Sequence, residues 1–142
     1  MDLLIRPHEG IGPIRFGMDS NAVRNILGGT VRSFRKTADA KAPTDAFDEY
    51  GMHVYYDDAG RCEAVEVASP GTPILHGQPL IGRPFEELRH MLEQIDPKAE
   101  VDDAGLTAPS LGIGVFAPFA SDSPGEPVEG VIVFKEGYYN HP

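Results

Sequence analysis

The side chains that could perform catalysis or hold a metal ion are few and scattered in this sequence. Its histidines are His8, His53, His76, His90 and His141. Histidine suits general base chemistry and metal binding near neutral pH. However, no two of these residues have the four-residue separation that places a pair on one face of a helix for zinc. The spacing therefore predicts no metal site, no cofactor and no catalytic histidine.

The possible nucleophiles give no stronger signal for catalysis. Cys62 is the single cysteine, so it has no partner for an internal disulfide or a thiolate cluster. It begins an alternating apolar segment, 62–67, which favours a buried strand residue over a reactive thiol. No Gly-x-Ser-x-Gly pattern is present, and the segment 10–13 lacks the third glycine of a nucleotide-binding loop. We therefore expect a protein that is not an enzyme.

Composition and charge restrict the classes of partner. The 142 residues are 41% hydrophobic and 24% charged, which is typical of one globular domain. A net charge of −10 disfavours nucleic acid, because the phosphate backbone would repel it. No apolar run reaches the roughly 18 residues of a membrane span, and residues 1–7 lack a basic start before an apolar stretch. The expected location is the cytoplasm, with no membrane contact.

Internal similarity predicts that about 65 residues are used twice. Segment 17–27 aligns with 82–92, with identical Gly, Arg and Leu positions, and segment 62–67 aligns with 128–133. A third pair, 50–55 with 111–116, occurs in the same order. We therefore predict a single domain, 1–142, made of two repeats at about 10–72 and 75–138.

Each repeat is predicted to contain a helix followed by strands. Apolar residues at helical spacing predict helices within 18–27 and 84–95, with Ile26 and Ile95 in their buried stripes. Asp19 or Ser20 is the expected cap of the first helix, and Gly28 its expected end.

Alternating residues predict strands at 31–35, 52–56, 61–68, 113–117 and 128–135, with a hairpin turn at 57–60. The segment 37–48 is predicted to be a polar loop. The expected fold class is α+β: two tandem helix-plus-antiparallel-sheet repeats forming one continuous antiparallel sheet with helices on one face.

Strand alternation predicts which side chains the sheet turns away from its helices. If Val65, Val67, Val131 and Val133 face the helices, the opposite face displays His53, Tyr55, Glu66, Phe116, Ile132 and Phe134. Aromatic side chains offer a large contact area at low entropic cost, so this face suits partner binding. Tyr138 and Tyr139 could extend the surface, and the alternative is that a loop or a second copy of the chain covers it.

Segment 14–28 resembles the opening of the BamE-like and β-lactamase-inhibitor-protein-like repeat. The matching residues are Gly17, Met18, Val23, Leu27 and Gly28, and the second copy keeps Gly82, Leu88 and Leu92. The resemblance implies a tandem architecture of helix units with a four-stranded sheet, whose concave face holds a partner protein through aromatic residues.

The leading functional hypothesis is a non-enzymatic protein-binding module, such as a bacterial immunity or inhibitor protein that blocks a partner enzyme or toxin. An acidic inhibitor would associate fast with a basic enzyme through electrostatic steering. One alternative is a small-molecule-binding, peptide-binding or catalytic domain that uses a cleft between the repeats, with His53 and His76 as its candidates. Another is a homodimeric structural module.

Overall fold

The computed structural model describes residues 2–35, 37–39, 42–120, 122–123 and 125–138. Its helices are α1 (Ser20–Leu27) and α2 (Phe85–Ile95), with a 3-10 turn at Asp48–Tyr50. The strands are β1 (Asp2–Arg6), β2 (Gly10–Ile11), β3 (Ile14–Arg15), β4 (Arg32–Phe34), β5 (Thr44–Phe47), β6 (Met52–Tyr56), β7 (Cys62–Ala68), β8 (Thr72–Leu75), β9 (Gln78–Pro79), β10 (Glu100–Val101), β11 (Gly105–Ala108), β12 (Ile113–Phe116) and β13 (Gly130–Phe134). The predicted mixture of helix and strand is confirmed.

Eight of these strands form an antiparallel sheet, called here the large sheet, in the order β10-β11-β12-β13-β7-β6-β5-β4. Each helix is followed in the chain by four strands of this sheet, and the two sets of four meet at its centre. There Val131 lies opposite Val67, and Val133 lies opposite Val65. All four valines are buried, so they belong to the inner face of the large sheet, as strand alternation predicted.

The prediction of one continuous sheet is wrong, because the remaining strands form a second, small sheet. Its order is β3-β2-β1-β8-β9, and β1 runs parallel to β8. Buried Leu3, Ile11 and Leu75 pack this sheet into the common hydrophobic core. The pairing of β1 with β8 holds this sheet together, and it joins short segments that contain or adjoin proline and lie about 70 residues apart in the chain. Local alternation therefore could not predict it.

A second correction concerns residues 37–48, which were expected to be a polar loop. Thr44–Phe47 is strand β5, and all four of its residues are buried. Asp45 faces the helix side of the sheet, where its carboxylate accepts two hydrogen bonds from Arg24 of α1, at 2.7 and 3.1 Å. The Tyr56 hydroxyl donates a third, at 2.9 Å. This pairing stabilises a charged residue in the core and anchors α1 to the sheet.

The helix ends follow the capping signals in the sequence. The carboxylate of Asp19 accepts a hydrogen bond from the Ala22 amide at 2.9 Å, and α1 ends at Gly28, whose φ of 66° favours glycine. In α2 the buried stripe is Phe85, Leu88 and Leu92, and the helix stops before Asp96. Ile26 and Ile95, which the sequence predicted to be in the buried stripes, are exposed at the ends of the two helices.

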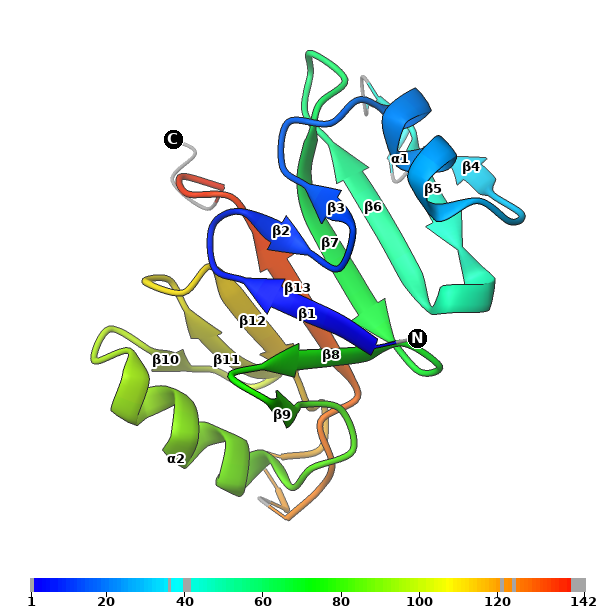
Figure 1. Cartoon of the computed structure of the whole chain (residues 1–142). Coiled ribbons are helices and arrows are strands. Elements are labelled where there is room, and N and C mark those ends of the chain that lie inside the picture. Colours follow the sequence, from blue (N-terminus) through cyan, green and yellow to red (C-terminus); the bar gives the residue numbers. More distant parts are fainter. Residues whose placement is uncertain (1, 36, 40–41, 121, 124, 139–142) are drawn as a thin grey trace.

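Both helices and the small sheet cover the same face of the large sheet (Figure 1). The small sheet lies across the central strands, with α1 and α2 on either side of it. No described helix or strand lies over the opposite face, which we call the outer face. Neither α1 nor α2, the two helices in the described part of the chain, is long and apolar enough to cross a membrane.

Candidate functional site

A continuous row of side chains crosses the outer face from one edge of the large sheet to the other. Strand register sets its order as Arg32, Ala46, His53, Glu66, Ile132, Gly114, Thr107 and Glu100. Register-matched residues in neighbouring strands point to the same face of a sheet. This row therefore runs through the middle of any binding surface on the outer face. It contains three of the six residues that the sequence predicted as a binding surface.

The half of the outer face built from β4 to β7 is a contiguous cluster. His53 Nδ1 lies 3.9 Å from a carboxylate oxygen of Glu66, and the Tyr55 hydroxyl donates to the same oxygen at 3.2 Å. The ring of Phe34 meets His53 edge to face, with the ring centres 5.7 Å apart. The guanidinium of Arg32 lies 5.1 Å from the centre of the Phe34 ring. Sequence reasoning missed Phe34 and Arg32, although their period-two placement in the predicted strand 31–35 could have shown them.

Arg32 also pairs with Asp48 through two hydrogen bonds of 3.2 Å. Hydrogen bonding to this guanidinium, with the attraction of its charge, holds the pKa of Asp48 below its ordinary value. Asp48 therefore stays ionised at neutral pH, and the Arg32 charge at this edge of the face is locally balanced.

The three remaining aromatic and apolar residues of the predicted surface differ in their exposure to solvent. Phe116 is 49% exposed and Ile132 is half-buried, so both are accessible on the outer face. Phe134 is only 4% exposed, because Tyr138 stacks on it with 5.6 Å between ring centres. Phe134 thus supports the surface from beneath, and Tyr138 presents the aromatic ring. Tyr139 lies outside the described residues.

The half of the outer face built from β10 to β13 is hollow. Two adjoining cavities, of about 740 Å³ and 320 Å³, share Asp102, Thr107 and Tyr138 in their walls. The smaller one has Gly105, Gly114 and Gly130 in its lining, so its floor lacks side chains. We call the two cavities together the acidic groove. Its charged lining residues are Glu66, Lys98, Glu100, Asp102 and Glu136.

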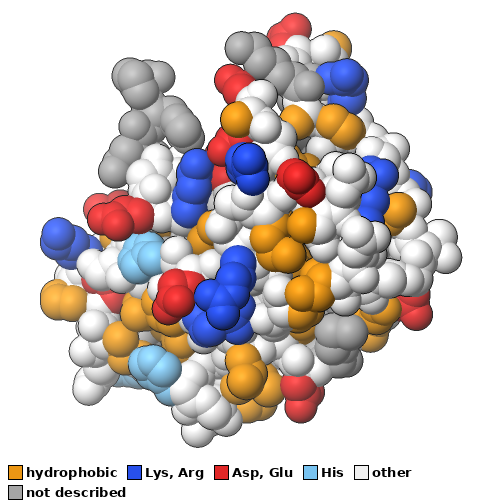
Figure 2. Space-filling model, turned by 45° about the horizontal axis from the view of Figure 1, so that its top comes forward, with side chains coloured by type: hydrophobic (Ala, Val, Ile, Leu, Met, Phe, Trp, Pro, Cys, Tyr) orange, Lys and Arg blue, Asp and Glu red, His pale blue; other side chains and the backbone are white. Residues whose placement is uncertain are grey.

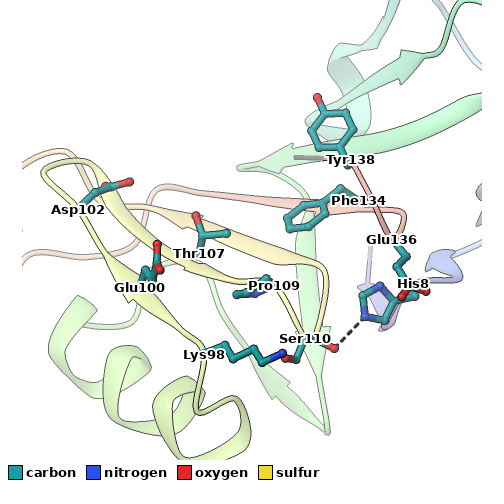
Figure 3. A pocket seen from close by; sticks show the side chains of 11 residues that line it. His8, Lys98, Glu100, Asp102, Thr107, Pro109, Ser110, Phe134, Glu136 and Tyr138 are labelled. Atoms are coloured by element: carbon teal, nitrogen blue, oxygen red, sulfur yellow. Dashed lines mark hydrogen bonds between the residues drawn. The ribbon is translucent and has the colours of Figure 1, made fainter. Parts of the chain in front are cut away.

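Figure 3 shows the larger cavity of the acidic groove. Glu100 and Asp102 stand at one end and Glu136 at the other, with the Phe134 ring between them. His8 reaches this cavity from the loop after β1, and its Nε2 donates to the Ser110 carbonyl at 2.8 Å. Sequence reasoning predicted Phe134 as part of a binding surface but assigned no role to Glu100, Asp102 or Glu136. The lining comes from four separate segments of the chain, and only the fold brings them together.

The two histidines that the sequence offered as candidates for one ligand-binding or catalytic site lie apart in the fold. Within the described ranges, no group of three or more His, Cys, Asp or Glu side chains is arranged to hold a metal ion. His53 lies on the outer face, whereas His76 lies in the turn between β8 and β9 of the small sheet, so they do not form one site. Figure 2 shows the molecule from a side other than the outer face, and there acidic, basic and hydrophobic side chains are interspersed.

Cys62 is buried at the start of β7, and burial raises the pKa of its thiol to about 12. We expect the folded protein to resist Ellman's reagent and to lose stability as the pH rises from about 8.5, the ordinary thiol pKa, towards 12. In that window the unfolded chain releases a proton that the folded chain retains. Relative to Cys62→Val, the loss should reach about 1 kcal/mol at pH 9.5 in urea unfolding. Parallel pH profiles for the two proteins would contradict a buried, protonated thiol.

The candidate site is therefore the outer face of the large sheet, with an aromatic and charged cluster on one half and the acidic groove on the other. Its exposed aromatic rings and carboxylates can contact a partner through stacking and charge-assisted hydrogen bonds. No protein family model, no curated protein and no solved structure matches this chain.

Proposed function

We propose that this chain is a non-enzymatic protein-binding module whose partner docks on the outer face of the large sheet. The observation that carries the proposal is the contrast between the two faces. The inner face is buried under two helices and the small sheet, whereas the outer face presents Tyr55, Glu66 and Phe116 with no described helix or strand above them. Apolar and aromatic side chains on an uncovered sheet face are typical of interaction surfaces.

The charge of the chain favours an enzyme or toxin with a basic surface as the partner. Residues 73–142 contain 11 acidic and 4 basic residues, against 11 and 8 in residues 1–72, and the acidic groove belongs mostly to this second half. Attraction between opposite charges speeds association and is screened by salt. The proposed role is that of an immunity or inhibitor protein, and the free thiol of Cys62 is compatible with a reducing cytoplasm.

We also propose that the scaffold arose by duplication of a unit of one helix and four strands, as in the BamE-like and β-lactamase-inhibitor-protein-like repeat. Matched hydrogen bonds support this. The Gly17 amide donates to the Cys62 carbonyl at 2.9 Å, and the Gly82 amide donates to the Val128 carbonyl at 2.8 Å. The donors are 65 residues apart and the acceptors 66, which agrees with the aligned sequence blocks.

The test of protein binding is capture of a partner by the full chain from extract of its natural source, with a surface variant alongside. In Tyr55→Ala/Phe116→Ala the outer face loses two aromatic contacts, and we expect at least about a tenfold loss of affinity for the captured partner, measured with both proteins purified. The matched control is Leu4→Ala/Ile26→Ala, which removes two exposed apolar side chains from β1 and α1 instead. It should bind as the unmodified chain does.

Three results would count against the proposal. Equal binding by the two double variants would show that the interface lies away from the outer face. A dimer in solution that Tyr55→Ala/Phe116→Ala converts to a monomer would show that a second copy covers this face. A stoichiometric small molecule released from the purified chain, with no protein captured, would favour the ligand-binding alternative.

A further inference from the structure

The acidic groove is larger than the cavity of about 200 Å³ that Asp48, His53 and Glu66 line on the other half of the outer face. Its two cavities adjoin through Asp102, Thr107 and Tyr138 and cross strands β10 to β13. Neighbouring strands are about 4.8 Å apart, so four strands span roughly 14 Å, close to the length of four extended residues. The groove therefore fits a short extended segment better than a single side chain.

The hollow results from glycines at outer-face positions of three neighbouring strands. Gly114 occupies in β12 the place in the outer row that His53 occupies in β6. Gly130 and Gly105 flank Phe116 in the adjoining strands. With no side chains on these glycines, the backbone of β11 to β13 forms the floor, and Phe116 and Tyr138 stand at its sides.

The groove carries an excess of negative charge. Glu100, Asp102 and Glu136 are exposed around the larger cavity, and Lys98 is the one cation in its lining among the described residues. Neither Glu100 nor Glu136 forms an ion pair with a described residue. The Asp102 carboxylate accepts the Ala104 and Gly105 amides through one oxygen, at 2.8 Å each, which fixes its orientation at the rim.

Carboxylates beside aromatic rings form a suitable environment for a guanidinium group. Arginine donates several hydrogen bonds in a planar fork that matches a carboxylate, and its flat face stacks on an aromatic ring. The Tyr138 ring, held by its stack on Phe134, lies in the wall between the two cavities. One extended segment could thus place arginine side chains against carboxylates and rings together.

We propose that the acidic groove binds an extended, arginine-bearing segment of the protein partner. This proposal rests on the proposed function and assigns the chemistry of the partner within it. The partner's backbone crosses the strands over the glycine floor, and its guanidinium groups pair with Glu100 and Glu136.

The test uses a fluorescein-labelled peptide of alternating arginine and glycine, six residues long, titrated with the full chain at low salt. We expect saturable binding, and about a tenfold weaker affinity for Glu100→Gln/Glu136→Gln, from the loss of two exposed charge pairs. The control Glu86→Gln/Glu126→Gln removes the same net charge at exposed sites outside the groove. It should change the affinity by less than about twofold. A peptide with glutamate in place of arginine should not bind.

The outcomes separate this proposal from the proposed function. Equal weakening by both double variants would show attraction by overall charge and overturn the groove assignment, as would the absence of saturable binding. If a captured partner depends on Tyr55 and Phe116 but binds Glu100→Gln/Glu136→Gln normally, the protein-binding function stands and the groove proposal fails. Selective arginine-peptide binding with no protein partner would sustain the groove as a cation site and contradict the proposed function.

Discussion

Replacing Arg24 by methionine should lower the free energy of unfolding by about 3 kcal/mol. The side chain of Asp45 is 1% exposed, and Arg24 is the cation that pairs with it, 2.7 Å away. Methionine keeps most of the apolar length of arginine but leaves the carboxylate in the core with the Tyr56 hydroxyl as its remaining side-chain donor. Because Arg24 is itself 38% exposed, water can reach part of the site, and the expected loss is at the low end for a broken buried pair.

A double-mutant cycle measured by urea unfolding checks this prediction. In the Asp45→Asn background no buried charge remains to be compensated, so the further change Arg24→Met should cost less than about 1 kcal/mol. The matched control is Arg32→Met, which breaks the exposed pair with Asp48 and should change stability little. If Arg24→Met cost the same with and without the Asp45 carboxylate, the pairing would not be what stabilises this part of the fold.

Local signals were sufficient to predict the elements whose residues are close in sequence. The hairpin of β6 and β7 lies where alternation and the turn at 57–60 placed it. Its tip carries Asp57, whose carboxylate accepts the backbone amides of Ala59 and Arg61. Burial alone would raise the pKa of Asp57, but these hydrogen bonds and Lys135 outweigh it and hold the pKa below its ordinary value. Such a turn is fixed by a few adjacent residues.

Elements that depend on distant partners were not predictable in the same way. Asp45 made β5 look like a loop, because a charged residue in a core strand is stable only with a partner, and Arg24 is 21 residues earlier. The small sheet depends on a parallel pairing between β1 and β8. In each case the decisive contact is tertiary, and no local pattern records it.

The sequence was sufficient to predict which residues share the outer face, but not the relief of that face. Alternation placed His53, Glu66 and Ile132 on one side of the sheet, as their register in the row confirms. It could not show that Tyr138 covers Phe134, because the two lie in a strand and the turn that follows it. The acidic groove was invisible for a related reason, since a hollow is defined by absent side chains on several strands at once.

Substitution by alanine should destabilise the protein strongly at Gly105 of the groove and only slightly at Gly114. At Gly105 a Cβ atom would lie 1.9 Å from the Val115 carbonyl oxygen, which belongs to the backbone of the paired strand β12. Relieving that overlap requires β11 and β12 to separate, and we expect a loss of about 3 kcal/mol or more in the free energy of unfolding. At Gly114 the closest atom to the new Cβ is the Ile132 side-chain Cγ2, at 2.9 Å. Ile132 is half-buried, so a change of its χ1 or a small shift of its side chain towards solvent can relieve this overlap without separating the strands.

Gly114→Ala should therefore stay within about 1 kcal/mol of the unmodified chain, since the reduced freedom of the unfolded state offsets the crowding. Urea unfolding of both variants gives the comparison, with the slope against denaturant checking that each unfolds as one unit. A large loss of stability in Gly114→Ala would mean that the groove floor cannot accept a methyl group at Gly114 any more easily than at Gly105. A small loss of stability at Gly105 would mean that β11 is not packed against β12 as described.

If the expected result is found, Gly114→Ala is a variant that narrows the acidic groove while the fold is retained. A fall in its affinity for the arginine peptide would then report on the shape of the groove and not on stability.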